Sequence, residues 1–234
     1  MKNISEFNSK IVSNYLRFKS NSESLLLICK DVIIFREEKL NTLSERLEIS
    51  KKSFSEDGDW DKYVDNNLSV MLSQKVYEND FDYLFYNSIF ISLFSLFEIH
   101  FTKLGKKCEQ FEDKTLKIKD LKGNSDIDTV RKYMNLVLNI ETASAENQSW
   151  KELEDFKSIR NAIVHNENQL NKVNTTKIHS LKGIQKLKQH NIKYSEQEVY
   201  FKINSSEFLI DFVNTSNHYS KILLNEILTA ANPS

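Results

Sequence analysis

The sequence predicts an all-α helical bundle that carries one small β-hairpin near its C-terminus. The 234 residues include only four glycines and one proline, whereas the turns of sheet-rich folds favour both residue types. Apolar residues recur at three- and four-residue steps along most of the chain, which is the spacing of a helix face. A single stretch near the C-terminus alternates between apolar and polar residues instead, and this pattern is typical of a strand.

The length and charge of the chain restrict its organisation. We expect residues 1–234 to form a single domain, with a helical core over 1–170, a basic connector and β-hairpin over 171–204, and a C-terminal helix over 205–234. The formal net charge of −1 predicts no general attraction to nucleic acid, so a nucleic-acid surface would have to be a local patch.

Cysteine usage and the N-terminus favour a cytoplasmic protein. Cys29 and Cys108 are isolated in the sequence, which is more typical of buried thiols in a reducing compartment than of a disulfide framework. The first residues, MKNISEFNSK, contain no apolar leader segment. We therefore expect a protein that is neither secreted nor inserted in a membrane.

The N-terminal half is expected to contain two helical regions followed by a central helix. Apolar residues at helical spacing cover residues 22–49, and a second region begins near Trp60 and breaks around 78–80. Residues 82–104 are apolar on nearly every side, as in the middle helix of a bundle. We expect Gly105 to end this helix.

The C-terminal half is expected to hold three further helices and the strand. Residues 126–141 form the first helix, and a capping box over Ser149–Glu152 starts the second. Residues 198–204 alternate in polarity, which predicts a strand that pairs with 192–194 as a hairpin. Residues 206–230 form the last helix.

The second of these helices carries an unusual polar pair in the stretch SIRNAIVHNENQ, residues 158–169. At about 100° per residue, with Leu153 as the origin, Arg160 lies at about −20°, inside the apolar arc. Asn161 and His165 follow on a shared flank at about +80° and +120°. A guanidinium that faces the core requires either a paired carboxylate or a solvated cleft.

Two interpretations of Arg160 follow from this position. The first is a structural ion pair with a buried carboxylate, and Glu98 is the candidate because it too interrupts an apolar run (SLFEIHF). The second is a catalytic role together with His165, with Asn161 between them in the sequence. A lone histidine at a helix C-terminus is usually structural, because the helix dipole stabilises an imidazolium by roughly 0.3–1 kcal/mol.

Arg160-Asn-Ala-Ile-Val-His165 resembles the R-x(4–6)-H signature of the HEPN superfamily, including the polar residue that often follows the arginine. The resemblance covers about residues 22–170. It implies a compact helical bundle and a metal-independent endoribonuclease without cofactors, in which Arg160 and His165 are the catalytic pair and Asn161 supports them. As the candidate partner of Arg160, Glu98 would then lie behind the pair. It also implies a homodimer that brings two motifs to one RNA cleft, and a toxin or phage-defence effector with an antitoxin or defence-system partner.

The sequence departs from one branch of that superfamily. Toxins that are neutralised by a nucleotidyltransferase partner carry a tyrosine two residues after the motif histidine, and this chain has Glu167 there. We therefore expect no inactivation by modification of that position. The sequence also lacks H-E-x-x-H, Walker, G-x-G-x-x-G and G-x-S-x-G motifs, so we expect no metal site and no nucleotide cofactor.

A basic segment follows the motif. Residues 168–195 contain six lysines and no acidic residue, a charge of +6, so the remainder carries −7 to give the total of −1. Such asymmetry is typical of a surface that tracks phosphates, although a solvated connector would show it too. The lysines proposed to contact RNA are Lys172, Lys177, Lys182, Lys186 and Lys188.

Three functions remain open on the sequence. The first is the metal-independent endoribonuclease, which the intact arginine–histidine pair favours. The second is a non-catalytic HEPN-like dimer that binds a nucleotide, an RNA or a partner protein. The third is a structural helical bundle with a buried Arg160–Glu98 pair.

Overall fold

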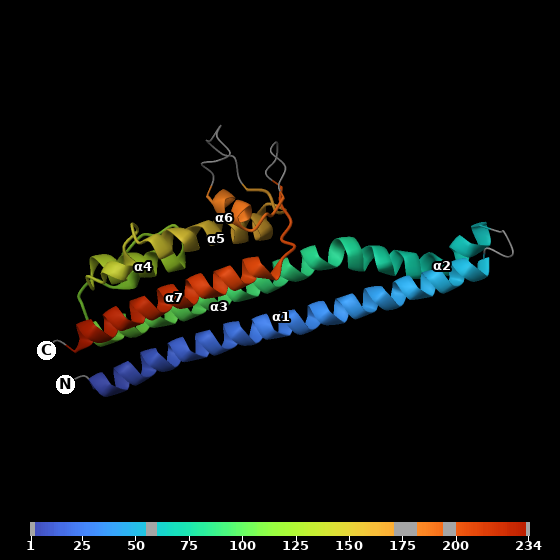
Figure 1. Cartoon of the computed structure of the whole chain (residues 1–234). Coiled ribbons are helices and arrows are strands. Elements are labelled where there is room, and N and C mark those ends of the chain that lie inside the picture. Colours follow the sequence, from blue (N-terminus) through green and yellow to red (C-terminus); the bar gives the residue numbers. More distant parts are fainter. Residues whose placement is uncertain (1–2, 55–59, 171–181, 194–199, 233–234) are drawn as a thin grey trace.

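The structure, a computed structural model, describes residues 3–54, 60–170, 182–193 and 200–232. It is an elongated helical bundle in which α1 (Ile4–Phe54) runs along the whole length (Figure 1). The helices α3 (Phe81–Glu112) and α7 (Ser206–Ala231) lie side by side against α1. On their other side, α4 (Asp126–Leu136) packs on α3. The helix α5 (Gln148–His165) packs on α3 and on α7. The predicted all-α bundle is confirmed over the described residues.

The first helix is much longer than predicted, because it begins at Ile4 instead of residue 22. Its added N-terminal turns bury Phe7, Ile11 and Phe18, which follow one another at four- and seven-residue steps. Phe7 stacks on Phe111 near the end of α3, with ring centroids 4.0 Å apart. The extension is therefore part of the bundle core.

The break predicted around residues 78–80 is a π-helical turn. The helix α2 (Trp60–Lys75) returns along the far half of α1, and the π-helical turn Val76–Asp80 joins it directly to α3 (Figure 1). Arg36 of α1 holds this turn, because its Nε donates to the Tyr77 carbonyl oxygen at 3.0 Å and lies 3.1 Å from Asp82 Oδ1. A π turn holds one residue more than an α turn and so shifts the following side chains around the helix axis.

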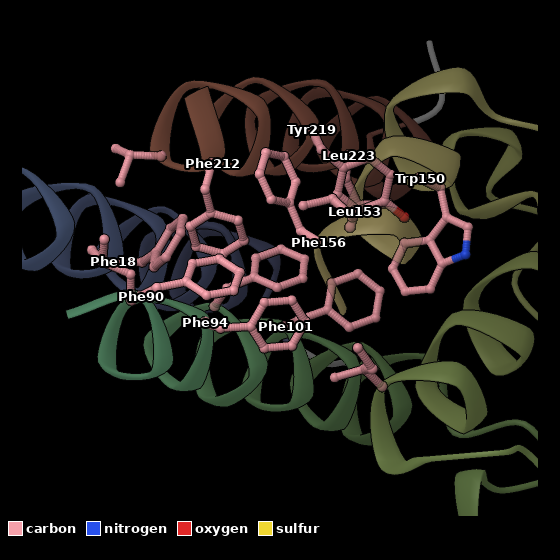
Figure 2. Packing of buried hydrophobic residues seen from close by; sticks show 14 of the residues in the cluster. Phe18, Phe90, Phe94, Phe101, Trp150, Leu153, Phe156, Phe212, Tyr219 and Leu223 are labelled. Carbon is pink, nitrogen blue, oxygen red and sulfur yellow. The ribbon is translucent and has the colours of Figure 1, made fainter. Parts of the chain in front are cut away.

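Aromatic rings from three helices form the centre of the core (Figure 2). Phe90 and Phe94 come from α3, Phe156 from α5 and Phe212 from α7. Phe212 lies 5.2–5.5 Å from the other three ring centroids, mostly edge-to-face. These distances are the favoured ones for aromatic pairs, and the packing fixes α5 against α3 and α7.

Gly105 does not end the central helix, because α3 continues to Glu112 and Asp113 takes the left-handed conformation there (φ 52°). Gly105 is instead a contact point between helices. A Cβ atom at this position would collide with the Val130 side chain of α4. The absence of a side chain therefore lets α4 approach α3 closely.

One helical stretch of the described chain, Trp60–Glu112, is long and apolar enough to cross a membrane by length and composition. Core helices of bundles meet the same criteria. The apolar part of this stretch includes Phe90, Phe94 and Phe97, which are fully buried among the other helices.

The segment before α7 is extended in its described part. Phe201 and Ile203 are fully buried, as the alternating pattern predicts, and Tyr200 forms an antiparallel bridge with Gln169. Residues 194–199 lie outside the described residues, so the hairpin with 192–194 stays a prediction. The connector also contains a short helix that the sequence pattern did not predict, α6 (Ile184–Gln189).

His100 is buried in the seam between α1 and α3. Its side chain stacks on Phe18, with ring centroids 4.7 Å apart, and its Nδ1 lies 2.9 Å from Asn14 Nδ2. The Asn14 amide also donates to the His100 carbonyl oxygen at 3.1 Å. Burial lowers the pKa of His100 from 6.5 to about 4, so the folded protein holds this ring neutral.

Acidification from about pH 7 to about pH 4.5 should therefore lower the free energy of unfolding by about 2–3 kcal/mol. The unfolded chain takes up a proton at His100 below its ordinary pKa of 6.5, whereas the folded chain does so only near 4. The stabilisation is thus complete above 6.5 and is lost as the pH falls towards 4. Urea unfolding at the two pH values measures the loss. His100→Leu should flatten the dependence, exposed His218→Ala should not, and an unchanged slope in His100→Leu would assign the effect to another group.

Candidate functional site

The helix that carries the arginine–histidine pair is fixed by its cap and by its buried face. The cap is Asn147, whose side-chain oxygen accepts a hydrogen bond from the Trp150 amide at 3.1 Å, so the predicted capping box over Ser149–Glu152 is wrong. The predicted apolar arc is confirmed except at Val164, which falls within the arc but is 42% exposed. Along α5, residues at helical spacing are buried against α3 and α7. These residues are Trp150, Leu153, Phe156, Ile159 and Ala162.

Arg160 lies within that arc by its helical angle, and its side chain is half-buried, with 23% exposed. Its Nη1 donates to Asn161 Oδ1 at 3.1 Å, and its Nη2 lies 3.9 Å from Glu98 Oε2 on α3. The Nε atom is buried and has no hydrogen-bond partner among the described residues. Three of the predicted site residues are thus brought together, with Asn161 orienting the guanidinium.

The contact between Arg160 and Glu98 is loose. A distance of 3.9 Å exceeds that of a charge-assisted hydrogen bond. Burial raises the pKa of Glu98, while Arg160 and Lys157 act in the opposite direction. The guanidinium therefore retains donors that an incoming anion can use.

His165 is the last residue of α5 and is exposed. The helix ends directly after it, because the Asn166 and Asn168 amides both donate to the Ala162 carbonyl oxygen, at 3.1 and 2.9 Å. Glu167 and Asn168 take left-handed conformations, with φ of 49° and 66°. This turn sets the imidazole at the open end of the helix, five residues after Arg160.

Asn168 anchors that turn and was not identified from the sequence. It is 2% exposed, and its Oδ1 accepts from Tyr83 Oη at 3.3 Å and from Asn87 Nδ2 at 3.4 Å. Its Nδ2 donates to the Phe201 carbonyl oxygen at 3.2 Å. An asparagine just after a helix end is a common αL residue, and this was the signal available in the sequence.

The end of α5 runs antiparallel to α3. Arg160 lies opposite Glu98, whereas Asn168, eight residues later, lies opposite Asn87. The motif therefore follows a stretch of α3 whose outer side is exposed. We call this exposed stripe the α3 outer face, and it consists of Leu84, Ser88, Ser92 and Ile99.

The three predicted RNA-binding lysines that the structure describes, Lys182, Lys186 and Lys188, differ in their surroundings. Lys172 and Lys177 lie outside the described residues. Lys182 is exposed and pairs with Glu154 at 2.8 Å, while Lys188 is half-buried on α6.

Lys186 lies in a buried ion-pair cluster. Its side chain is 6% exposed, and its Nζ lies 2.9 Å from Glu152 Oε2, 3.0 Å from Asp211 Oδ2 and 4.8 Å from the Phe156 ring centroid. Burial lowers the pKa of Lys186, but the two carboxylates outweigh burial and raise it. An ammonium held by two carboxylates in this way favours a structural role over the predicted contact with RNA.

His190 extends the buried cluster of Lys186, Glu152 and Asp211. The spacing of these residues in the sequence did not reveal the cluster. The His190 Nε2 atom lies 2.9 Å from Asp211 Oδ2. Burial raises the pKa of Asp211, but the hydrogen bonds and charges of His190 and Lys186 prevail and lower it. Within the described parts of the chain, no three His, Cys, Asp or Glu side chains are grouped to hold a metal ion.

Comparisons with protein-family models, with curated proteins and with solved structures give no match to this chain. The resemblance to the HEPN superfamily therefore rests on the motif residues and on their setting in a helical bundle.

Proposed function

We propose that this protein is a metal-independent endoribonuclease of HEPN type that acts as a homodimer in the cytoplasm. The observation that carries the proposal is the loosely paired guanidinium of Arg160, 3.9 Å from Glu98, on the same helix end as the exposed His165. The resemblance alone supports a role as a toxin or phage-defence effector with an antitoxin or defence-system partner.

The two side chains supply complementary chemistry for RNA cleavage. An imidazole titrates near neutral pH and can take the proton of a ribose 2′-hydroxyl. The 2′-oxygen then attacks the adjacent phosphorus and the bond to the 5′-oxygen breaks. A guanidinium stabilises the charge on the phosphoryl oxygens through parallel hydrogen bonds. The products are a 2′,3′-cyclic phosphate and a 5′-hydroxyl, and no metal takes part.

A dimer supplies the second proton-transfer group. One imidazole takes the proton of the nucleophile, and the leaving 5′-oxygen needs another donor, which would be His165 of the partner subunit. The α3 outer face borders the motif and is suited to close approach, since the Ser88 and Ser92 hydroxyls donate to carbonyl oxygens of their own helix at 2.7 and 2.9 Å. If the dimer interface buries these two serines, it therefore leaves no hydrogen-bond donor without an acceptor.

Ile99→Glu should convert the dimer to monomers and lower RNA cleavage at least tenfold. Ile99 is 51% exposed, so the new carboxylate remains solvated in the monomer and is buried only in the proposed dimer. Sedimentation at several protein concentrations measures the mass. The matched control is Leu27→Glu on α1, where the side chain is 62% exposed and away from the motif, and this variant should stay dimeric. A wild-type mass of one chain would contradict the composite site.

Cleavage of single-stranded RNA in EDTA tests the function itself. The purified protein should cut the RNA and leave a 2′,3′-cyclic phosphate, which acid treatment opens, and a 5′-hydroxyl, which polynucleotide kinase labels. A requirement for divalent metal would refute the mechanism. RNA binding without any cleavage would favour the non-catalytic binding dimer.

The Arg160–Glu98 contact favours a second candidate, a structural bundle in which this pair serves stability. Partly exposed pairs at such distances contribute about 0–1 kcal/mol, so Arg160→Ala should lower the free energy of unfolding by no more than about 1 kcal/mol. Urea unfolding measures the change, with exposed Lys221→Ala as reference. A loss of several kcal/mol would support the structural role instead.

A further inference from the structure

A pocket of about 480 Å³ lies beside the end of α5, between the start of α3 and the extended segment before α7. In Figure 1 this segment, orange to red, descends towards α3 before α7 begins. Two tyrosines (Tyr83, Tyr200), two lysines (Lys193, Lys202) and two asparagines (Asn79, Asn204) line the pocket. Its volume lies within the range of small-molecule sites.

The alternation of the extended segment builds one wall of the pocket. Phe201 and Ile203 are fully buried in the core. Tyr200, Lys202 and Asn204 line the pocket, and Ile203 forms part of its floor. The segment therefore brings an aromatic ring, an ammonium and an amide to the pocket, and its buried residues hold them in place.

The opposite wall adds a second ring. Lys202 Nζ lies 5.2 Å from the centroid of the Tyr83 ring. Tyr200 lies near the Tyr83 hydroxyl, since burial first and Tyr200 next raise the pKa of Tyr83. Two aromatic rings and an ammonium thus meet within one pocket, as in sites that stack a base and neutralise its phosphate.

Two carboxylates also line the pocket, and each has a partner. Asp82 lies 3.1 Å from Arg36 Nε. Glu78 Oε1 accepts a hydrogen bond from Gln74 Nε2 at 2.8 Å and is exposed. The lining therefore holds two lysines and two carboxylates, and Arg36, Glu37 and Glu167 lie close to it. Because Arg36 pairs with Asp82, Lys193 and Lys202 can face one phosphate, and Glu78 offers an acceptor to the amino group of a base.

The pocket connects directly to the candidate catalytic helix end. Tyr83 donates to Asn168 Oδ1 at 3.3 Å, and Asn168 lies three residues after His165. The main chain continues the connection, because the Phe201 amide donates to the Asn168 carbonyl oxygen at 3.1 Å. A nucleotide held here would have its neighbours along the strand close to the arginine–histidine pair.

We propose that this pocket binds one unpaired nucleotide of single-stranded RNA, with its base against Tyr200 and its phosphate at Lys202 and Lys193. The assignment of the strand as RNA rests on the proposed ribonuclease function. The pocket is a binding site that adds to the catalytic pair, and it determines which part of the strand lies over His165.

The test measures binding separately from cleavage. All variants are made in the His165→Ala protein, which keeps the RNA intact, and binding of a fluorescein-labelled single-stranded RNA of mixed sequence is followed by anisotropy. Tyr200→Ala and Lys202→Ala should each weaken the Kd about tenfold, because a base–aromatic stack and a phosphate contact each contribute on this scale. Tyr200→Phe keeps the ring and should bind within about twofold of the parent.

The control for charge is Lys221→Ala, an exposed lysine about 22 Å along α7 from its first residue, and it should bind like the parent. Lys202 is exposed as well, so its variant remains informative if Tyr200→Ala does not fold. Unchanged binding in Lys202→Ala and Tyr200→Ala, or no RNA binding by the parent, would overturn the proposal.

The two proposals fail in different ways. If the wild-type protein does not cut RNA but the pocket variants weaken binding, the ribonuclease function is wrong and the pocket stands. If the wild-type protein cuts RNA in EDTA, and the pocket substitutions change neither binding in the His165→Ala protein nor cutting in the wild-type protein, the pocket is wrong and the ribonuclease function stands.

Discussion

His165→Ala should lower the rate of RNA cleavage at least a hundredfold while the fold and the dimer remain intact. General acid–base catalysis contributes about 10²–10⁴-fold to such reactions, and the proposed dimer would lose both imidazoles at once. The side chain is exposed at the last position of α5. Its removal should therefore change the free energy of unfolding by no more than about 0.5 kcal/mol.

A gel assay of labelled RNA in EDTA measures this rate, and urea unfolding with sedimentation confirms that the variant is intact. The matched control is His218→Ala, an exposed histidine on α7, which should cut at the wild-type rate. Retention of cleavage in both His165→Ala and Arg160→Ala would refute the assigned pair. Loss of cleavage together with loss of the dimer would show that His165 acts on assembly.

Lys186→Ala should lower the free energy of unfolding by about 2–3 kcal/mol at neutral pH. The substitution leaves Glu152 and Asp211 without the ammonium that lies 2.9 and 3.0 Å from them. It also removes an alkyl chain and a charge from the face of the Phe156 ring. This loss of stability is smaller than that expected for a fully buried ion pair, because the Glu152 and Asp211 side chains are 35% and 29% exposed.

Urea denaturation measures the change, and Lys182→Ala is the matched control. Lys182 pairs with Glu154 at 2.8 Å but is 65% exposed, so its loss should cost less than about 1 kcal/mol. If the Lys186→Ala protein is as stable as the wild type but binds RNA more weakly, the result supports the predicted role of Lys186 in RNA binding.

The helical periodicity of the sequence predicted the architecture because these helices owe their stability to one apolar face. The arc of α5 and the partnership of Arg160 with Glu98 both followed from the positions of polar residues inside apolar runs. The same reasoning missed the first turns of α1. There the buried residues Phe7, Ile11 and Phe18 are spread among polar ones, and the N-terminal pattern is weak on its own.

Features that depend on tertiary contacts were not predictable in this way. Gly105 looked like a helix end, yet its role is the close approach of α4, which only the packing reveals. Lys186 looked like one lysine of a solvated run, yet its partners come from two other helices. The pocket combines residues from the start of α3 with Lys193 and residues 200–204, and no local sequence pattern records that proximity.

The π-helical turn Val76–Asp80 has a consequence for the evolution of this chain by insertion and deletion. Such a turn is equivalent to a single inserted amino acid within a continuous helix, and Glu78 and Asn79 of the pocket lie in it. Deleting one residue there would restore α-helical geometry while α2 and α3 keep the faces that they now present, because the π turn absorbs the extra residue locally. The turn that brings Glu78 and Asn79 to the pocket would be lost, so the inserted residue and the shape of the pocket are inherited together.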